Sequence, residues 1–444
     1  MREPGWGAMF QYREWLQTSP PLFLLLERGA IAIFGLSSSA LRAVPLALAM
    51  AAAWAMWAAS RRLLPWPVGL VASALLVTNP TLIEYSRTAK QYSGEVAASA
   101  LLLWSAAALK ERPARALWVA AIAPLLGYSS VFLLPGLALA LLLCGHRRQA
   151  AGLTAVAGVE LGALYWWFLR PNYSPELRAF WAADADGGWT PALALAAFMC
   201  IACAVTLCWR LRDEWFSWVC VLPCLLLALS ATVGWYPANP RTRLFALPCF
   251  LLLLARSTSG HRLSACVRFS TDPYARGSLP KAACTIALAL GALSLWRQVA
   301  EHRAAPQEDY AQAVSYLREH MAPADLLLVH AAAREGFLLY ASIERWTPAR
   351  VEYGATGWPC CARGHDARPG ISSKDSVLRD LDAKIPPGFR GRIWLLYPTR
   401  PSHWSYAGLN EGDLWRNHVW DRGCPPGPYV ALANLAISPM NCGR

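Results

Sequence analysis

The stretch that decides the fold is "GLVASALLVTNPTLIEYSRTAKQYSGEVAASALLLW", residues 69–104. Two apolar runs flank a polar segment that holds Glu84, Arg87, Lys90 and Glu95. Apolar runs with a short charged interruption are typical of helices that cross a membrane and meet water between crossings. The segment therefore predicts a helical membrane domain, and it raises the question of what these charges bind.

Composition extends this prediction to most of the chain. Of the 444 residues, 56% are hydrophobic and only 16% are charged, whereas a soluble domain has about 25% charged residues. Apolar runs of about 14 to 21 residues alternate with short basic or Pro/Gly-rich loops. The predicted membrane-spanning helices are 40–60, 66–79, 91–109, 116–127, 130–145, 149–169, 190–208, 215–235, 243–256 and 282–298. We expect a polytopic α-helical membrane protein with about ten helices.

The net charge of +13 arises largely from basic residues in the loops between the predicted spans. This distribution does not indicate a nucleic-acid partner. Basic residues gather in alternate loops, which the positive-inside rule assigns to the cytoplasm. These residues are Arg61, Arg62, Lys110, Arg112, Arg115, Arg147, Arg148, Arg210, Arg212, Arg256, Arg262, Arg268, Arg276 and Lys281. The remaining loops and both chain ends then face outward, and we expect a multi-pass protein of the inner (cytoplasmic) membrane.

The segment 1–39 is predicted to lie outside the membrane. An outward N-terminus needs a signal peptide or an earlier spanning helix, and residues 1–39 show neither pattern. "PPLFLLLERGAIAIFG", residues 20–35, is interrupted by Glu27 and Arg28 and indicates an interfacial amphipathic helix. We expect that a first transmembrane helix, which the given sequence lacks, precedes Met1.

The domain organisation is 1–39, an extracytoplasmic juxtamembrane segment, 40–299, the transmembrane domain, and 300–444, a small extracytoplasmic domain. In the last part, helical spacing at 308–321 precedes a buried-strand run at 326–330, and residues 376–385 and 391–398 repeat that order. This alternation predicts a small α/β domain.

Four of the 13 cysteines lie in the predicted α/β domain. Cys424 and Cys442 are a plausible disulfide in an oxidising compartment, because the bond would hold a Pro/Gly-rich tail. Cys360 and Cys361 either pair elsewhere or stay reduced. No His/Cys set has zinc spacing, so we expect no metal site, and nothing in the sequence supports a divalent cation or another cofactor.

Two basic pairs face outward against the positive-inside trend: Arg87 with Lys90, and Arg241 with Arg243. On a helix that begins near Ser86, Arg87 and Lys90 would share one face, and such cations suit a phosphate. Two alternatives stay open. The first pair can reach toward lipid phosphates at a helix end, or an arginine can pair with a nearby carboxylate.

The carboxylates near these cations are candidates for a general base. They are Glu3, Glu14, Glu27, Glu84, Glu95, Asp184 and Asp186. Most carboxylates in loops are simply solvated, so position alone does not select one.

Three segments resemble markers of the GT-C membrane glycosyltransferases, the bacterial family 39 type akin to protein O-mannosyltransferases and the lipid A aminoarabinose transferase. They are "TSPPLFLLLERGAIAIFGLSSSALRAVPL" at 18–46, "NPTLIEYSRTAKQYSGEV" at 79–96 and "YPANPRTRLFALP" at 236–248. Their order along the first 250 residues also matches, and the number of helices between them is suitable.

The resemblance implies that a sugar moves, with inversion, from a polyprenyl-phosphate donor to an envelope lipid, glycan or protein at the outer face of the membrane. Arg87, Lys90, Arg241 and Arg243 would then bind the donor phosphate, because negative charge grows on that leaving group. Tyr85, Gln91, Tyr92, Pro20 and Pro21 would form the surrounding pocket.

The chain departs from the family pattern at the catalytic base. The family's catalytic aspartate lies in the first outer loop, whereas the first aspartate of this sequence is Asp184, and Ser19 stands where many relatives have histidine. Glu3, Glu14 and Glu84 are weak replacements. Two other readings remain: a truncated or degenerate membrane protein without catalysis, and a transporter, although no paired broken helices of an inverted repeat are seen.

Overall fold

A computed structural model describes residues 19–109, 111–170, 215–232, 243–259, 309–354, 374–399 and 411–443. The chain divides into two compact units. The described part of the first, the helical unit, lies within residues 19–259, and that of the second, the C-terminal unit, lies within residues 309–443. The predicted segments 1–18, 190–208 and 282–298 fall outside the described residues.

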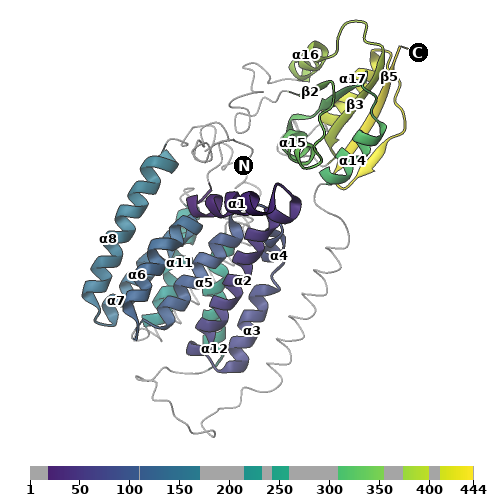
Figure 1. The fold of residues 1–444 in the computed structure, drawn as a ribbon. Coiled ribbons are helices and arrows are strands. Elements are labelled where there is room, and N and C mark those ends of the chain that lie inside the picture. Colours follow the sequence, from purple (N-terminus) through teal and green to yellow (C-terminus); the bar gives the residue numbers. More distant parts are fainter. Residues whose placement is uncertain are drawn as a thin grey trace. The chain divides into compact units, whose positions relative to one another are not determined.

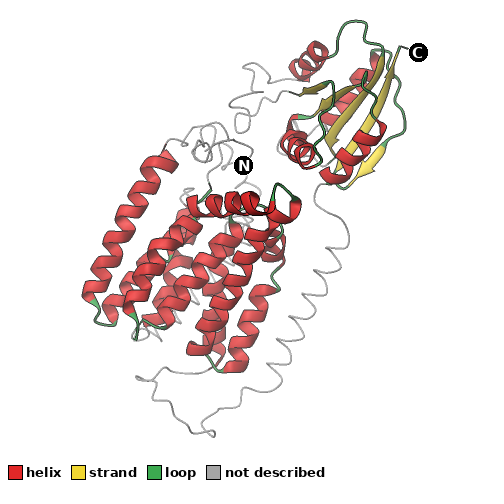
Figure 2. Ribbon diagram, in the orientation of Figure 1, coloured by secondary structure: helices red, strands yellow, loops and turns green. Residues whose placement is uncertain are grey.

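Helices make up the first unit (Figures 1 and 2). They are α1 (Pro21–Phe34), α2 (Ser38–Leu63), α3 (Trp66–Val77), α4 (Pro80–Ser86), α5 (Tyr92–Ala107), α6 (Pro113–Leu126), the short η3 (Tyr128–Phe132), α7 (Leu134–Leu143), α8 (Arg147–Leu164), η4 (Tyr165–Leu169), α11 (Trp215–Thr232), η6 (Leu244–Ala246) and α12 (Leu247–Ser259). The eight predicted spans that fall on described residues are all helical.

Local sequence explains where several of these helices begin. Proline occupies the first turn of α1, α3, α4, α6 and α7, where its missing N–H is not needed. The Ser37 hydroxyl accepts a hydrogen bond from the Ala40 amide at 3.1 Å and caps α2. Asn79 caps α4 in the same way through the Leu82 amide.

Small residues allow the central helices to pack closely. The contact of α2 with α5 is the most extensive between helices in the described part of the chain. Ala52, Ala55 and Ala59 of α2 and Ala97 and Ala100 of α5 are fully buried. Alanine at such positions lets two helix backbones approach each other. Around this pair, α1 lies across one end of the bundle (Figure 1).

Few of the described helices are both long and apolar enough to cross a membrane without a break. Among the described residues, α2 is the one unbroken helix that is both long and apolar enough to cross a membrane. The pair α3 and α4 passes the same test together but is bent by 57°. The other apolar helices are shorter, for example α6 and α12.

Large apolar side chains lie on the outside of the helical unit. Of the 24 that are exposed among the described residues, 22 belong to this unit and two, Trp420 and Tyr429, belong to the C-terminal unit. Trp54, Trp66, Trp118 and Val159 are examples on four different helices. An apolar surface spread over several helices needs an apolar surrounding or a partner.

Two glycines let the start of α5 approach the end of α6. A Cβ atom at Gly127 would lie 2.6 Å from the Cα of Glu95, and one at Gly94 would lie 2.7 Å from the carbonyl oxygen of Leu126. Both distances are below any normal contact, so a side chain at either position would separate the two segments.

The C-terminal unit contains one mixed sheet with the strand order β2-β1-β3-β5-β4. Its elements are α14 (Tyr310–His320), β1 (Leu326–Val329), η7 (Ala331–Ala333), α15 (Arg334–Ile343), β2 (Val351–Tyr353), α16 (Lys374–Lys384), β3 (Gly391–Pro398), α17 (Glu411–Asp421), β4 (Val430–Leu432) and β5 (Leu435–Cys442). Strand β1 is parallel to β2 and β3, whereas β5 is antiparallel to β3 and β4.

Alternating side chains of the strands build two apolar layers. Leu327 and Val329 pack with residues of α14 and α15 on one face of the sheet. Leu326 and Leu328 pack with residues of α16 and α17 on the other face. The two predicted helix-then-strand pairs correspond to α14 with β1 and to α16 with β3, so this unit is a three-layer α/β fold (Figure 2).

A disulfide joins Cys424, just after α17, to Cys442 at the end of β5. This is the pair that the sequence analysis singled out. Cys360 and Cys361, for which both pairing elsewhere and the reduced state were left open, lie outside the described residues.

Gly127→Ala should destabilise the helical unit by about 1–3 kcal/mol, because the added methyl group overlaps the main chain of Glu95. Thermal unfolding in detergent, followed by tryptophan fluorescence, measures the effect. Gly158→Ala on α8 is the matched control: a Cβ atom there meets nothing within 4 Å, and alanine favours a helix by about 0.5–1 kcal/mol. Equal transition temperatures for the two variants would contradict the close contact.

Replacing both Cys424 and Cys442 by serine should make the C-terminal unit easier to unfold, by about 2–4 kcal/mol, because the bond restricts the unfolded chain. Limited proteolysis of the full chain reports this as faster cleavage within residues 309–443. Cys144→Ser, which changes a thiol outside any disulfide, should leave the cleavage rate unchanged. Identical cleavage of all three proteins would show that the bond adds no stability.

Candidate functional site

Polar residues from three segments that are distant in sequence meet at the end of the helical unit where α1 lies. The Ser19 hydroxyl donates to the Gln91 side-chain oxygen at 3.3 Å. The Tyr128 hydroxyl donates to the Ser19 carbonyl oxygen at 3.0 Å, and the Ser129 hydroxyl donates to Glu95 Oε2 at 2.9 Å. We call these five residues, Ser19, Gln91, Glu95, Tyr128 and Ser129, the polar cluster.

The local chain path explains how the cluster forms. Helix α6 ends at Leu126, Gly127 is extended, and the short helix η3 then presents Tyr128 and Ser129 beside the first turn of α5. Gln91 precedes α5 and Glu95 lies in its first turn. Because Gly94 and Gly127 have no side chain, these segments can lie in close contact.

A fourth segment reaches the same neighbourhood. The rings of Phe132 in η3 and Phe245 in η6 stack with centroids 5.4 Å apart. Helix η6 also packs against α5. Arg243 directly precedes η6 and is partly exposed. The described part of the third marker segment, residues 243–248, therefore lies in the same region as the first two marker segments.

The structure corrects one prediction about Arg87 and Lys90. They do not share a helix face, because α4 ends at Ser86 and α5 begins at Tyr92. The Thr88 hydroxyl donates to the Glu84 carbonyl at 2.7 Å and so satisfies the end of α4. Both cations are exposed on the short connection that follows.

The other predicted site residues divide into two groups. Tyr85 and Tyr92 lie in contact across the α4–α5 connection, with ring centroids 4.5 Å apart, and Pro20 and Pro21 form the start of α1. Glu84 lies on α4. Glu3, Glu14, Arg241, Asp184 and Asp186 lie outside the described residues.

The opposite end of the bundle is basic. Helix α2 begins beside α1 and ends with Arg61 and Arg62, and Arg62 forms a 3.0 Å ion pair with Glu111. Arg115 lies over the ring of Trp104, 4.3 Å from its centroid. The helical unit thus has a polar-cluster end and a basic end.

Sequence reasoning missed Tyr128 and Ser129 as members of the site. The available signal was "GYSS", residues 127–130, a small polar interruption between two apolar runs. Such an interruption also fits an ordinary loop, and the partners of these hydroxyl groups depend on packing between distant segments.

Glu27 is a carboxyl group whose side chain is inaccessible to solvent. Its side chain is 0% exposed on the inner face of α1, and neither carboxylate oxygen has a hydrogen-bond partner among the described residues. Burial raises the pKa of Glu27 to about 8. A carboxyl group without a partner is much less costly to bury in its protonated form.

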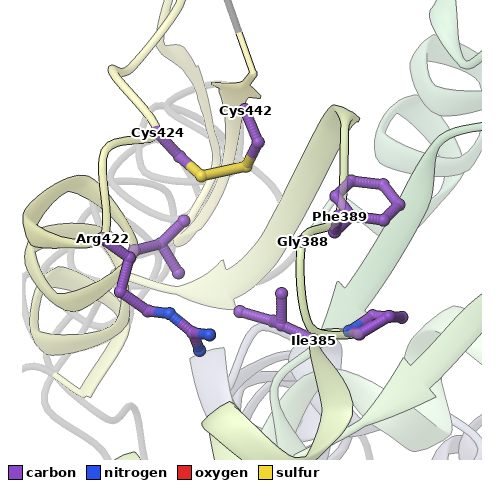
Figure 3. Close-up of a pocket in the computed structure, with 8 residues that line it drawn as sticks. Ile385, Gly388, Phe389, Arg422, Cys424 and Cys442 are labelled. Atoms are coloured by element: carbon purple, nitrogen blue, oxygen red, sulfur yellow. A yellow bond between two sulfur atoms is a disulfide. The ribbon is translucent and has the colours of Figure 1, made fainter.

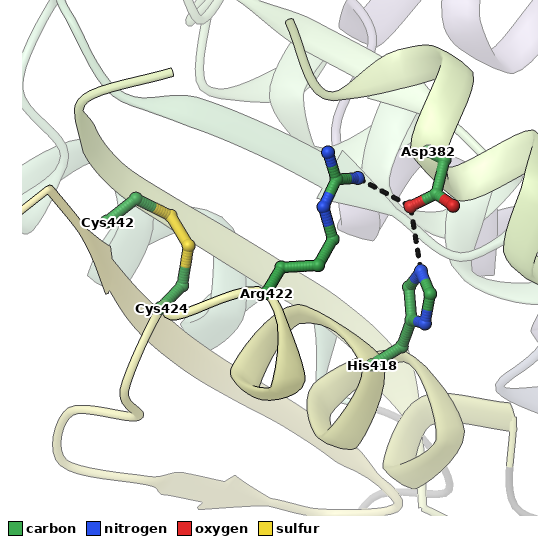
Figure 4. A network of polar contacts seen from close by, with 5 residues as sticks. All are labelled: Asp382, His418, Arg422, Cys424 and Cys442. Carbon is green, nitrogen blue, oxygen red and sulfur yellow. Dashed lines mark hydrogen bonds and ion pairs between the residues drawn. A yellow bond between two sulfur atoms is a disulfide. The ribbon is translucent and has the colours of Figure 1, made fainter. Parts of the chain in front are cut away.

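The C-terminal unit contains a second, smaller candidate site. A pocket with a volume of about 120 Å³ lies beside the disulfide. Ile385 and Phe389 form apolar walls of this pocket, and the guanidinium of Arg422 lies at its side (Figure 3). Asp382 Oδ1 accepts from Arg422 and from His418, the latter at 2.7 Å (Figure 4). Because this network is half-exposed and its charges neutralise one another, it carries little chemistry by itself.

No group of three or more His, Cys, Asp or Glu side chains that could hold a metal ion occurs within the described ranges. No model of a known protein family matches the chain, and no curated protein matches it in sequence.

Glu27→Gln should remove a pH dependence of stability. Because the folded state holds the Glu27 proton up to about pH 8 while the ordinary pKa is 4.5, stability is full below about pH 4.5 and falls as pH rises toward 8. The slope is at most about 1.4 kcal/mol per pH unit.

Thermal unfolding in detergent at a series of pH values measures this effect. The stability of wild type relative to Glu27→Gln should decrease between about pH 5 and pH 8, whereas Glu27→Asp keeps a carboxyl group and should keep the decrease. Parallel pH profiles for wild type and Glu27→Gln would contradict the burial of this group.

Proposed function

We propose that this protein is a polytopic membrane glycosyltransferase that moves a sugar from a polyprenyl-phosphate donor to an acceptor on the outer face of the inner membrane. The proposal covers the GT-C-like architecture, the inverting reaction and the placement of the C-terminal unit outside the cytoplasm. The envelope acceptor is a lipid, glycan or protein that carries a hydroxyl group.

The membrane part of the proposal is supported by surface composition. The helical unit exposes 22 large apolar side chains on the residues described, and lipid is the surrounding that accepts such a surface on all sides. The basic end, with Arg61, Arg62, Arg147 and Arg148, suits the cytoplasmic side. The polar cluster would then lie at the outer side.

Helix α1 fits the outer interface in the same setting. Phe23, Glu27 and Ala30 are buried on its inner face, whereas Ile33 and Phe34 are strongly exposed. A helix that lies across a bundle end with apolar residues outward can rest in the boundary between headgroups and acyl chains.

The observation that carries the proposal is the meeting of the three marker segments at one end of the bundle. Ser19 from the first marker contacts Gln91 from the second. The third packs there through Phe245 against Phe132, and η6 against α5. Segments that are separated in the sequence by 32 residues (47–78) and by 139 residues (97–235) therefore lie at one end of the bundle, as a common binding function would require.

The chemistry assigned to the site follows from the leaving group. When the bond between the anomeric carbon and the phosphate breaks, negative charge grows on the phosphate, and fixed cations lower the energy of that state. Arg87, Lys90 and Arg243 are the described cations of the second and third marker segments at this end. Tyr85 and Tyr92 would line the same pocket, and the prenyl chain would lie along the apolar helices.

Lys90→Ala and Arg243→Ala should each lower sugar transfer by about 10²–10³-fold, because each removes charge that stabilises the leaving phosphate. The assay uses membranes that contain each variant, with total polyprenyl-phosphate sugars as donors, and measures labelled sugar in the acceptor fraction. Expression of both variants should match wild type.

Arg148→Ala is the matched control, because Arg148 is an exposed arginine at the start of α8, at the basic end. It should transfer at the wild-type rate. Normal transfer by both Lys90→Ala and Arg243→Ala would remove them from the site, and no transfer by wild type in any membrane preparation would reject the proposed function.

A further inference from the structure

Glu95 combines burial with a fixed orientation. The side chain lies in the first turn of α5 and is 5% exposed. Ser129 donates its hydroxyl proton to Oε2 at 2.9 Å. The main chain on both sides is held by the glycine contacts, since Gly127 approaches the Cα of Glu95 and Gly94 approaches Leu126. The carboxylate therefore has one oxygen engaged and little freedom to rotate.

The other carboxylates described in the helical unit are less suitable as bases for an incoming hydroxyl group. Glu27 is sealed at 0% exposure. Glu111 is paired with Arg62 at the basic end. Glu160 lies on α8, which packs on α6 and α7, and Glu84 lies on α4 outside the polar cluster. Glu95 alone among these five belongs to the cluster in which the marker segments meet.

We infer that Glu95 is the general base of the proposed reaction and takes the proton of the acceptor hydroxyl group, with Ser129 as the residue that positions it. This inference rests on the proposed function. A positioned carboxylate speeds attack by a hydroxyl group because it removes the proton as the new bond forms.

The acceptor oxygen forms a bond to the anomeric carbon of the donor while the bond from that carbon to the phosphate oxygen breaks. The acceptor proton moves to Glu95 Oε1, and the polyprenyl phosphate leaves with the electron pair of the broken bond. Atoms and electrons balance with the donor and the acceptor alone.

The test compares two nucleophiles with the same polyprenyl-phosphate sugar. A hydroxyl acceptor must lose a proton, whereas the azide ion has none to lose and yields a glycosyl azide. Glu95→Gln should lower transfer to the hydroxyl acceptor by about 10²–10⁴-fold and leave azide transfer within about threefold of wild type, since the phosphate-binding cations are untouched.

Two further variants separate the base from a structural role. Ser129→Ala frees the carboxylate and should lower hydroxyl transfer by about fivefold without changing azide transfer, because one hydrogen bond is worth about 1 kcal/mol and that energy corresponds to about this factor in rate. Glu160→Gln is the control and should change neither reaction. If Glu95→Gln is not produced, Glu95→Asp replaces it, because the shortened side chain should slow hydroxyl transfer alone.

The outcomes are distinct. Equal loss of both reactions in Glu95→Gln would mean that Glu95 maintains the site and is not the base, and unchanged hydroxyl transfer would also overturn the inference. Loss of azide transfer in Lys90→Ala together with normal azide transfer in Glu95→Gln supports both proposals. A wild-type protein that performs neither reaction rejects the proposed function itself.

Discussion

The close contact between the start of α5 and the end of α6 is the constraint on which the helical unit depends. It exists because Gly94 and Gly127 present no side chain where the two segments meet. The contact brings Ser129 within hydrogen-bonding distance of Glu95 and Tyr128 within reach of the Ser19 carbonyl. Through Ser19 and Gln91, the start of α1 is then tied to the start of α5. Without the contact, the buried side chains of Ser129 and Glu95 would lose the hydrogen bond between them.

At this end of the bundle, exposed cations and a buried carboxylate lie in different environments. The cations Arg87 and Lys90 remain exposed on the α4–α5 connection, whereas Glu95 is buried one turn into α5. An exposed cation can meet a phosphate and a buried carboxylate can meet a hydroxyl group without the two neutralising each other. In the proposed reaction, the leaving group and the attacking group need those opposite environments.

Much of the architecture could be predicted from the sequence, because it depends on local patterns. Apolar runs predicted eight spans that fall on described residues and are helical, and the alternation of helix and strand predicted the fold of the C-terminal unit. The placement of Arg87 and Lys90 on one helix was wrong, because α4 ends at Ser86 and α5 begins only at Tyr92. The spacing of the two cations does not reveal where these helices end and begin. Tyr128 and Ser129 were missed because their partners, Ser19 and Glu95, come from segments distant in sequence, and such contacts exist only after packing.

Helix α1 has a consequence for the dependence of the site on lipid. Its exposed residues Ile33 and Phe34 and its buried residues Phe23 and Glu27 lie on the same rigid element. In the proposed membrane setting, the depth of α1 is set by the bilayer surface, while the depth of α5 is set by the bundle. A thicker or thinner bilayer would therefore shift Ser19 against Gln91. Acyl-chain length would then act on the geometry of the polar cluster without any molecule binding to it.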